Sequence, residues 1–225
     1  SLWGRIELEF HGPTDGNPFL DVEFSATFRN GDTNLVVPGF YDGDGVFRLR
    51  FLPNATGLWR YETSSSAAAL NGQTGAVEVG AAKPGDHGPV VADGLHFRYA
   101  DGARYINIGT TAYAWNHQEQ ALQEQTLASL SQAPFTKIRM CVFPKHYRYN
   151  ETEPDHYPFK LVKKGQSTWP ATQEEAGWEF DFDEFNPAFF QHLEKRISQL
   201  AEIGVEADLI LMHPYDRWGF DHMSP

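Results

Sequence analysis

The sequence predicts two structural classes in one chain: an antiparallel, immunoglobulin-like β-sandwich, followed by the first part, about three strands, of an α/β (β/α)8 TIM barrel. Three observations lead to this prediction. Short runs of alternating polar and apolar residues extend to residue 79. A stretch rich in Gly, Pro and Ala follows, and the remaining sequence alternates between strand-like and helix-like patterns.

Each alternating run predicts a strand with one buried face, because successive side chains of a strand point to opposite sides. The runs are residues 5–10, 21–28, 46–51, 58–63 and 76–79. Between two of these runs, Asp42-Gly43-Asp44-Gly45 could be read as part of a calcium loop. The later acidic ligand of such a loop is missing, so we favour a hairpin turn in which glycine supplies the positive φ.

The second half of the chain starts after a segment with the composition of a linker. We therefore expect a sandwich domain over residues 1–82, a linker over 83–95 and the N-terminal part of a barrel over 96–225. A hairpin is predicted first, with strands over 96–99 and 104–108 around Asp101-Gly102 and the second strand continuing to residue 112.

Further along the chain, strands and helices alternate. A helix is predicted over 119–132 and a strand over 136–143. Asn186 and Pro187 are typical of a helix start, Gly204 of a helix end, and a strand is predicted over 206–212. A doubly wound nucleotide-binding sheet would place a glycine-rich turn after its first strand, but residues 109–117 contain none, so the barrel is favoured.

Composition excludes several classes of function. The 225 residues carry 30 Asp and Glu against 18 Lys and Arg, a net charge of −12, which disfavours nucleic acid as a partner. Cys141 is the single cysteine, so neither an intrachain disulfide nor a cysteine-based metal cluster can form, and we expect a buried thiol. No stretch is long and apolar enough to span a membrane, and no cofactor is expected. The sequence does not distinguish a soluble cytoplasmic protein from one exported after loss of a signal peptide.

Polar and aromatic residues follow each of the three predicted parallel strands. Because side chains at the carboxyl ends of barrel strands meet in one crevice, we expect these groups to converge on a ligand. Flat rings beside hydrogen-bonding groups suit a sugar, so we predict an oligosaccharide or polysaccharide substrate. The predicted substrate-binding residues are Trp115, His117, Arg139, Lys145, His146, Tyr147, His213, Tyr215, Asp216 and Trp218. The long segment between Pro144 and Glu184, with further aromatic residues, is expected to be a wall or lid over this site.

Several of these residues could instead have a structural role or bind a metal. Trp115 and Trp218 could pack against the barrel wall and not against a ligand. Arg139 lies in an otherwise apolar strand and, if buried, needs a carboxylate partner, either structural or in the active site. The residues His117, His146, His213 and Asp216 would have to meet around one point in a metal-dependent hydrolase, yet they lack a tight ligand spacing. A noncatalytic carbohydrate-binding module is the other alternative, although the sandwich shows no surplus of aromatic residues on its polar faces.

Longer stretches resemble a known family. Asn17-Pro18-Phe19, the segments 39–45 and 50–53, and Gly57-Leu58-Trp59 resemble the N-terminal β-sandwich domain that precedes many glycoside hydrolases. Residues 109–115, 137–145 and 213–220 resemble the apiosidase-like, endoglucanase-related (β/α)8 family attached to that domain. The resemblance covers essentially the whole chain.

The resemblance implies retaining hydrolysis of an O-glycosidic bond by two carboxylates, which in that family end the fourth and seventh barrel strands. By resemblance, Arg139 matches an arginine that holds the nucleophile, and His213 matches a histidine that lines the sugar site nearest the cleaved bond. We expect neither the fourth nor the seventh strand within these 225 residues. We therefore expect a truncated part of a longer glycosidase, with both catalytic Glu residues beyond residue 225 and no catalytic residue in this chain, which alone would be inactive.

Overall fold

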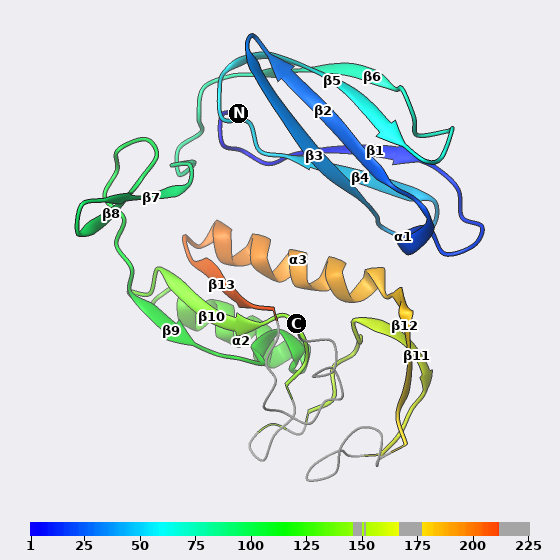
Figure 1. Cartoon of the computed structure of the whole chain (residues 1–225). Coiled ribbons are helices and arrows are strands. Elements are labelled where there is room, and N and C mark those ends of the chain that lie inside the picture. Colours follow the sequence, from blue (N-terminus) through cyan, green and yellow to red (C-terminus); the bar gives the residue numbers. More distant parts are fainter. Residues whose placement is uncertain (146–149, 151, 167–176, 212–225) are drawn as a thin grey trace. The chain divides into compact units, whose positions relative to one another are not determined.

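The computed structural model describes residues 1–145, 150, 152–166 and 177–211. The chain divides into two compact units, Ser1–Tyr105 and Ile106–Pro225, coloured blue to green and green to red in Figure 1. Within the described residues, no helix is both long enough and apolar enough to cross a membrane. Each unit has its own apolar core, and each is described separately below.

The first unit is built on one curled antiparallel sheet. Its strands are β1 (Ile6–His11), β2 (Phe24–Asn30), β3 (Thr33–Tyr41), β4 (Val46–Phe51), β5 (Gly57–Ser65) and β6 (Thr74–Val79), with a short helix, α1 (Pro18–Asp21), between β1 and β2. Their order in the sheet is β1-β4-β3-β2-β5-β6. This β-rich unit is consistent with the predicted sandwich, and the five predicted strands all form.

The curl of this sheet encloses an aromatic core. Phe10 of β1 and Tyr61 of β5 belong to strands far apart in the sheet, yet their ring centroids are 6.2 Å apart. Phe51 of β4 contacts Trp59 of β5 at 4.9 Å and stacks on Phe28 of β2 at 4.1 Å. Trp59 and Phe28 are fully buried. The alternating pattern of the sequence thus places one face of every strand in a shared core.

The sixth strand, β3, was missed by the sequence analysis. It contains Pro38, and a proline has no N–H for a sheet ladder, so it argues against a central strand. In the structure, β3 pairs with β2 over residues 33–38 and with β4 over residues 39–41. Pro38 therefore lies where the strand changes partners, and at this point one missing donor is tolerated.

The segment Asp42-Gly43-Asp44-Gly45 forms the turn between β3 and β4, as predicted. Gly43, Asp44 and Gly45 all have positive φ angles, of 92°, 50° and 76°. The Asp42 carboxylate accepts a 2.6 Å hydrogen bond from Nε of Arg48. The aspartate is thus tied to the neighbouring strand.

The segment predicted as a linker contains a strand. In the structure β7 (Val90–Asp93) pairs with β8 (His96–Tyr99), and Gly94 at the turn has a φ of 61°. The hairpin predicted between 96–99 and 104–108 is reduced to one bridge, between Arg98 and Arg104. The Asp93-Gly94 turn, which follows two valines, is a stronger hairpin signal than Asp101-Gly102, so the strand over 96–99 pairs with β7 and not with residues 104–108. The domain boundaries themselves stay a prediction.

The second unit contains a parallel sheet. Its strands β9 (Gly109–Thr111), β10 (Lys137–Cys141) and β13 (Glu206–Ile210) are connected through the helices α2 (Gln120–Leu130) and α3 (Pro187–Glu202). β10 lies between β9 and β13 and is parallel to both. A three-residue 3-10 turn, η1 (Trp115–His117), precedes α2. The strand order follows the chain order, as in the start of a (β/α)8 barrel, but the barrel stays a prediction.

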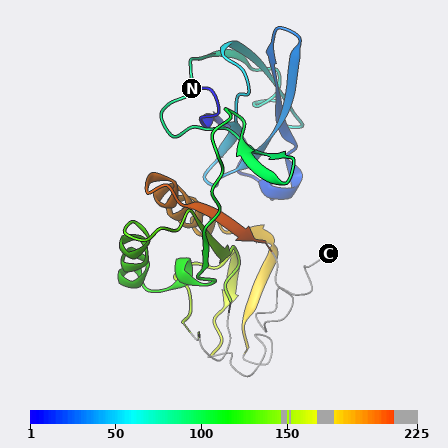
Figure 2. The same cartoon turned by 90° about the vertical axis from the view of Figure 1, so that its left-hand side faces the viewer.

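Both helices cover the same face of this sheet, and they lie on one side of its strands in Figure 2. Ile138 and Met140 of β10 are fully buried in one cluster with residues of both helices. The helix residues of that cluster are Leu127 and Leu130 of α2 and Phe189, Leu193 and Leu200 of α3. Along α3, the residues Phe189, Leu193 and Leu200 are buried and Ile197 is partly buried, at spacings of four, four and three residues, which is the period of one helix face.

The long segment before α3 is partly an ordered hairpin. β11 (Phe159–Lys163) and β12 (Glu179–Phe185) pair in antiparallel fashion with two irregularities in register. Phe159 is fully buried and contacts Phe182 and Phe185 at 5.3 and 5.1 Å. The segment is thus anchored in the core of the second unit, a role that a free lid would not have.

The start of α3 offers a test of local stability. The Asn186 side chain accepts a hydrogen bond from the Ala188 N–H at 3.2 Å and donates one to the Tyr157 carbonyl at 2.9 Å. Asn186→Ala removes both and should cost about 2 kcal/mol of unfolding free energy in urea. Asn186→Asp keeps the cap and loses the donor, so it should cost about half as much. Equal effects of the two substitutions would contradict the role of the cap.

Candidate functional site

The parallel sheet has one apolar face and one polar face. Because side chains alternate along a strand, Arg139 of β10 points away from the helices that cover Ile138 and Met140. The neighbouring residue of β13 in the register is Asp208. We call this side the polar face of the sheet. It carries the charged groups that the strands contribute, and we describe it as the candidate site.

Arg139 and Asp208 form an ion pair across the two strands. Nε and Nη2 of Arg139 each lie 2.9 Å from the same oxygen, Oδ2 of Asp208. The exposed fractions of the two side chains are 55% and 32%. Arg139 thus has the carboxylate partner that was expected. Its side chain is half exposed, because no apolar cluster of the described residues covers this face of β10.

A second charged group lies beyond the carboxyl end of β10. Lys145 is buried, and its Nζ lies 5.8 Å from the ring centroid of Tyr113, at the distance of a cation–π contact. The Lys145 carbonyl accepts a 2.6 Å hydrogen bond from Nδ2 of Asn150, whose Oδ1 accepts one of 2.7 Å from Gln118. The segments after β9 and β10 are therefore tied together at this edge of the sheet.

Trp115 and His117 lie on the other side of the sheet. Trp115 is buried in the cluster between the strands and the helices, and its Nε1 donates to Sδ of Met140 at 3.3 Å. The His117 ring is buried and stacks on Phe189 of α3, with 5.6 Å between centroids. The packing alternative for Trp115 therefore describes its position. The structure does not bring Trp115 or His117 to the polar face with Arg139.

Six predicted site residues lie outside the described residues. They are His146, Tyr147, His213, Tyr215, Asp216 and Trp218. The resemblance-based role of His213 and the aromatic cluster after β13 therefore stay predictions. The metal alternative used three of these six, and no group of three or more potential metal ligands occurs among the described His, Cys, Asp and Glu residues.

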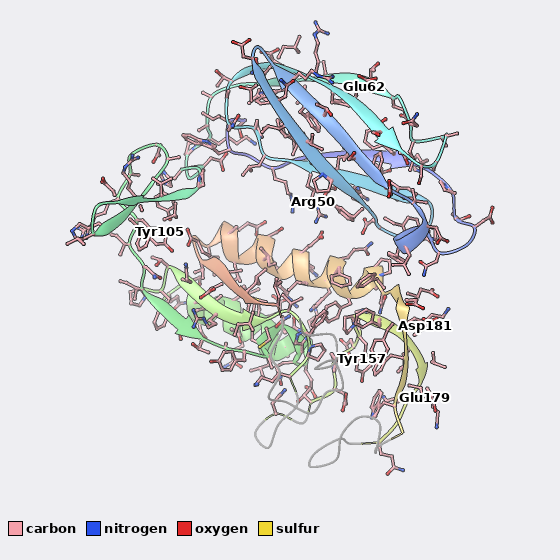
Figure 3. All side chains as sticks on the ribbon, in the orientation of Figure 1. Arg50, Glu62, Tyr105, Tyr157, Glu179 and Asp181 are labelled. Atoms are coloured by element: carbon pink, nitrogen blue, oxygen red, sulfur yellow. The ribbon has the colours of Figure 1, made fainter. Side chains whose placement is uncertain are left out.

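The aromatic residues assigned to a substrate wall are part of the core where they are described. Tyr157, labelled in Figure 3, and Trp178 are both buried, and their ring centroids are 5.3 Å apart. The Tyr157 hydroxyl donates a 2.8 Å hydrogen bond to Oε2 of Glu153. Burial raises the pKa of the Glu153 carboxyl, and burial together with Glu153 raises the pKa of Tyr157. This pair is thus held in the segment that leads to β11.

Sequence reasoning missed Asp208, and Tyr113 was not among the predicted substrate-binding residues. Part of the signal was present, because Glu206 and Asp208 are the two acidic residues of a strand that would pair with the strand of Arg139; the register decides which of them is the partner. The polar face presents the Arg139 guanidinium and the Asp208 carboxylate, which can donate hydrogen bonds to a neutral polar ligand and accept them from it. It supplies one strand carboxylate at Asp208, already engaged by Arg139, and a second at Glu206, whose Oε2 lies 3.7 Å from Nζ of Lys137.

The exposure of the Arg139–Asp208 pair predicts a small stabilising effect. A double-mutant cycle with Arg139→Gln and Asp208→Asn, measured by urea unfolding, should give a coupling energy below about 1 kcal/mol, because water screens the pair. The pair Arg29–Glu62, with side chains 52% and 57% exposed, is a matched reference in the first unit. A coupling above about 3 kcal/mol would mean that the pair is buried in solution.

Comparisons with known proteins match both units. The family model of a domain of unknown function, DUF5060, matches residues 1–66. A search of the curated proteins found no match. Among solved structures, the chain is similar to a crystal structure at 1.80 Å resolution of a protein from Bacteroides vulgatus described as a "putative glycoside hydrolase".

This similarity extends over nearly all of the chain. The identity is 53% and the TM-score 0.90, over 99% of this chain. The matched region is 43% of the Bacteroides protein, so the chain spans less than half of that protein's length.

Proposed function

We propose that this chain is part of a glycoside hydrolase that binds oligo- or polysaccharides and hydrolyses their O-glycosidic bonds. The observation that carries this proposal is the 53% identity over 99% of the chain to a protein described as a glycoside hydrolase. A shared fold alone would not indicate a shared function. The identity here extends through both units, including the strands that carry the polar face.

The proposal includes a (β/α)8 barrel of which β9, β10 and β13 are the first three strands. Two observations support it. The strands are adjacent in chain order, and both connecting helices cover one face. A doubly wound sheet would instead reverse its direction and place helices on both faces. In a barrel, the face opposite the helices is the inner one, and the ends of the strands carry the active site.

For the reaction we propose the retaining mechanism, in which one carboxylate attacks the sugar and another acts as acid and base. The two carboxyl groups must lie about 5 to 5.5 Å apart, with one of them free to react. Asp208 and Glu206, the strand carboxylates of the polar face, are both engaged by cations. We therefore place the catalytic pair outside this chain, and the greater length of the Bacteroides protein accords with that.

Within this chain, we propose binding and orienting roles. Arg139 presents its guanidinium on the polar face, where it can donate to a sugar hydroxyl or to a carboxylate. Lys145 and Tyr113 offer an ammonium group and a ring at the edge of the same sheet. Trp115 and His117 would support this edge from the helix side, where they are buried.

A glycan panel tests the proposal with the 225-residue chain itself. We expect at least one plant or bacterial polysaccharide to retard the chain in affinity electrophoresis. We expect no new reducing ends to appear, because we place the carboxylate pair outside this chain. Arg139→Lys should weaken that binding by about tenfold, since lysine cannot reproduce the guanidinium fork.

Arg29→Lys, the same change at an exposed position of the first unit, is the matched control and should leave binding unchanged. Two results would count against the proposal. Failure of every polysaccharide to bind would remove the carbohydrate substrate, and hydrolysis by this chain alone would show that a catalytic pair is present within it.

A further inference from the structure

A polar cavity of about 220 Å³ lies on the helix side of the parallel sheet. Its described walls come from η1, from α2, from α3 and from the segment 154–156. The residues that matter for its chemistry are Asn116, Gln123, His156, His192, Lys195 and Arg196. Because Arg139 points to the opposite face, this cavity is separate from the candidate site described above.

The charge of the cavity is opposite to that of the chain. Lys195 and Arg196 bring two permanent positive charges, and His156 and His192 bring two groups that can become positive. Asp155 is the one acidic residue among the described residues of its wall. In a chain with a net charge of −12, such a concentration of basic groups creates a local preference for anions.

Arg196 is held in place by hydrogen bonds from two of the three nitrogen atoms of its guanidinium group. The residue is 1% exposed. Nε donates to Oε1 of Gln123 at 2.6 Å, and Nη1 donates to Glu124 at 2.7 Å and to Gln199 at 2.8 Å. Nη2 makes no hydrogen bond to a described residue. The balancing carboxylate, Glu124, has a side chain that is 48% exposed, so water weakens its effect on the buried charge.

Asn116 provides a second, independent indication of a ligand. The residue is 1% exposed, and Nδ2 lies 3.2 Å from Nε2 of His117. Oδ1 is buried and accepts no hydrogen bond from a described residue. A buried carbonyl oxygen without a donor costs about 1 to 3 kcal/mol, so a bound group that donates here would recover that cost. A hydroxyl group is such a donor.

His192 adds a group that would report on a bound anion. Its Nε2 lies 3.0 Å from the Asn116 carbonyl and 3.0 Å from Oε1 of Gln123, so Nε2 carries the proton and donates to both acceptors. Burial lowers the pKa of His192, and the charges of Arg196, His156 and Lys195 lower it further, against the hydrogen bond to Asn116. These effects favour the neutral form of the ring.

We propose that this cavity binds a small hydroxycarboxylate of the size of a single sugar acid. The carboxylate would lie against Arg196 and Lys195, and a hydroxyl would donate to Oδ1 of Asn116. The volume is below the range of about 300 to 1,000 Å³ that larger ligands occupy, which excludes an oligosaccharide. This inference goes beyond the proposed function, because it needs neither the polar face nor hydrolysis.

Titration calorimetry on the 225-residue chain tests the proposal with D-glucuronate, D-glucose and inorganic phosphate. We expect saturable binding of D-glucuronate, with D-glucose and phosphate at least about tenfold weaker, because D-glucose lacks the carboxylate and phosphate lacks the alcohol hydroxyl groups. Lys195→Glu, at an exposed position of α3, should weaken glucuronate binding by about tenfold or more. Lys83→Glu makes the same charge change at an exposed position of the first unit and should have no effect.

A second measurement stays informative if the Lys195 variant folds poorly. The pKa of the His192 ring, followed by NMR, should rise when the unaltered chain is saturated with D-glucuronate, because a nearby negative charge favours the imidazolium. The proposal is overturned if glucuronate does not bind at millimolar concentration, if glucose or phosphate binds as well, or if the pKa of His192 is unchanged at saturation. Glycan binding at the polar face is measured separately, so a failure of either proposal is distinguishable.

Discussion

The structure of the second unit depends on the burial of one short strand. β10 is hydrogen-bonded along both edges, to β9 and to β13, and Ile138 and Met140 are fully buried under the helices. Because side chains alternate, the same packing fixes the opposite direction for Arg139. The burial of Ile138 and Met140 against the helices thus determines on which face of the sheet the charged side chain of Arg139 lies. Candidate residues that the sequence analysis assigned to one site are separated onto two faces, Arg139 on one and Trp115 and His117 on the other.

Much of the fold could be predicted from local sequence signals. Strands with a strict alternation and helices with clear caps, such as Asn186-Pro187 before α3, form where they were expected. The errors have physical causes. β3 was not predicted because it contains Pro38, and a proline lacks the N–H donor that a central strand needs. The proline is tolerated here because β3 changes its partner strand at this residue. β7 was not predicted because it lies in a segment whose small residues are typical of a linker. It forms because two valines and an Asp-Gly turn favour a hairpin more strongly than the surrounding composition favours a linker.

The candidate site was less predictable, because burial of a polar or aromatic residue depends on partners far away in the sequence. The buried ring of His117 stacks on Phe189 of α3. Likewise, the buried Arg196 of the cavity on the helix side donates a hydrogen bond to Gln123 of α2. Neither partner is evident from the neighbouring sequence. The carboxylate partner of Arg139 was expected, but Asp208 was not identified, because the register between β10 and β13 comes only from the structure.

The central claim is that residues on the polar face of the sheet contact the substrate and that residues on the helix-covered face do not. A crystal structure with a bound oligosaccharide would test this claim most directly. The ligand should be chosen from the polysaccharide that binds most tightly. We expect sugar rings at the polar face, with contacts to Arg139 or Lys145 and with Trp115 still buried beneath the helices. A sugar stacked on Trp115 in a rearranged η1 turn, with no contact on the Arg139 side, would contradict this account.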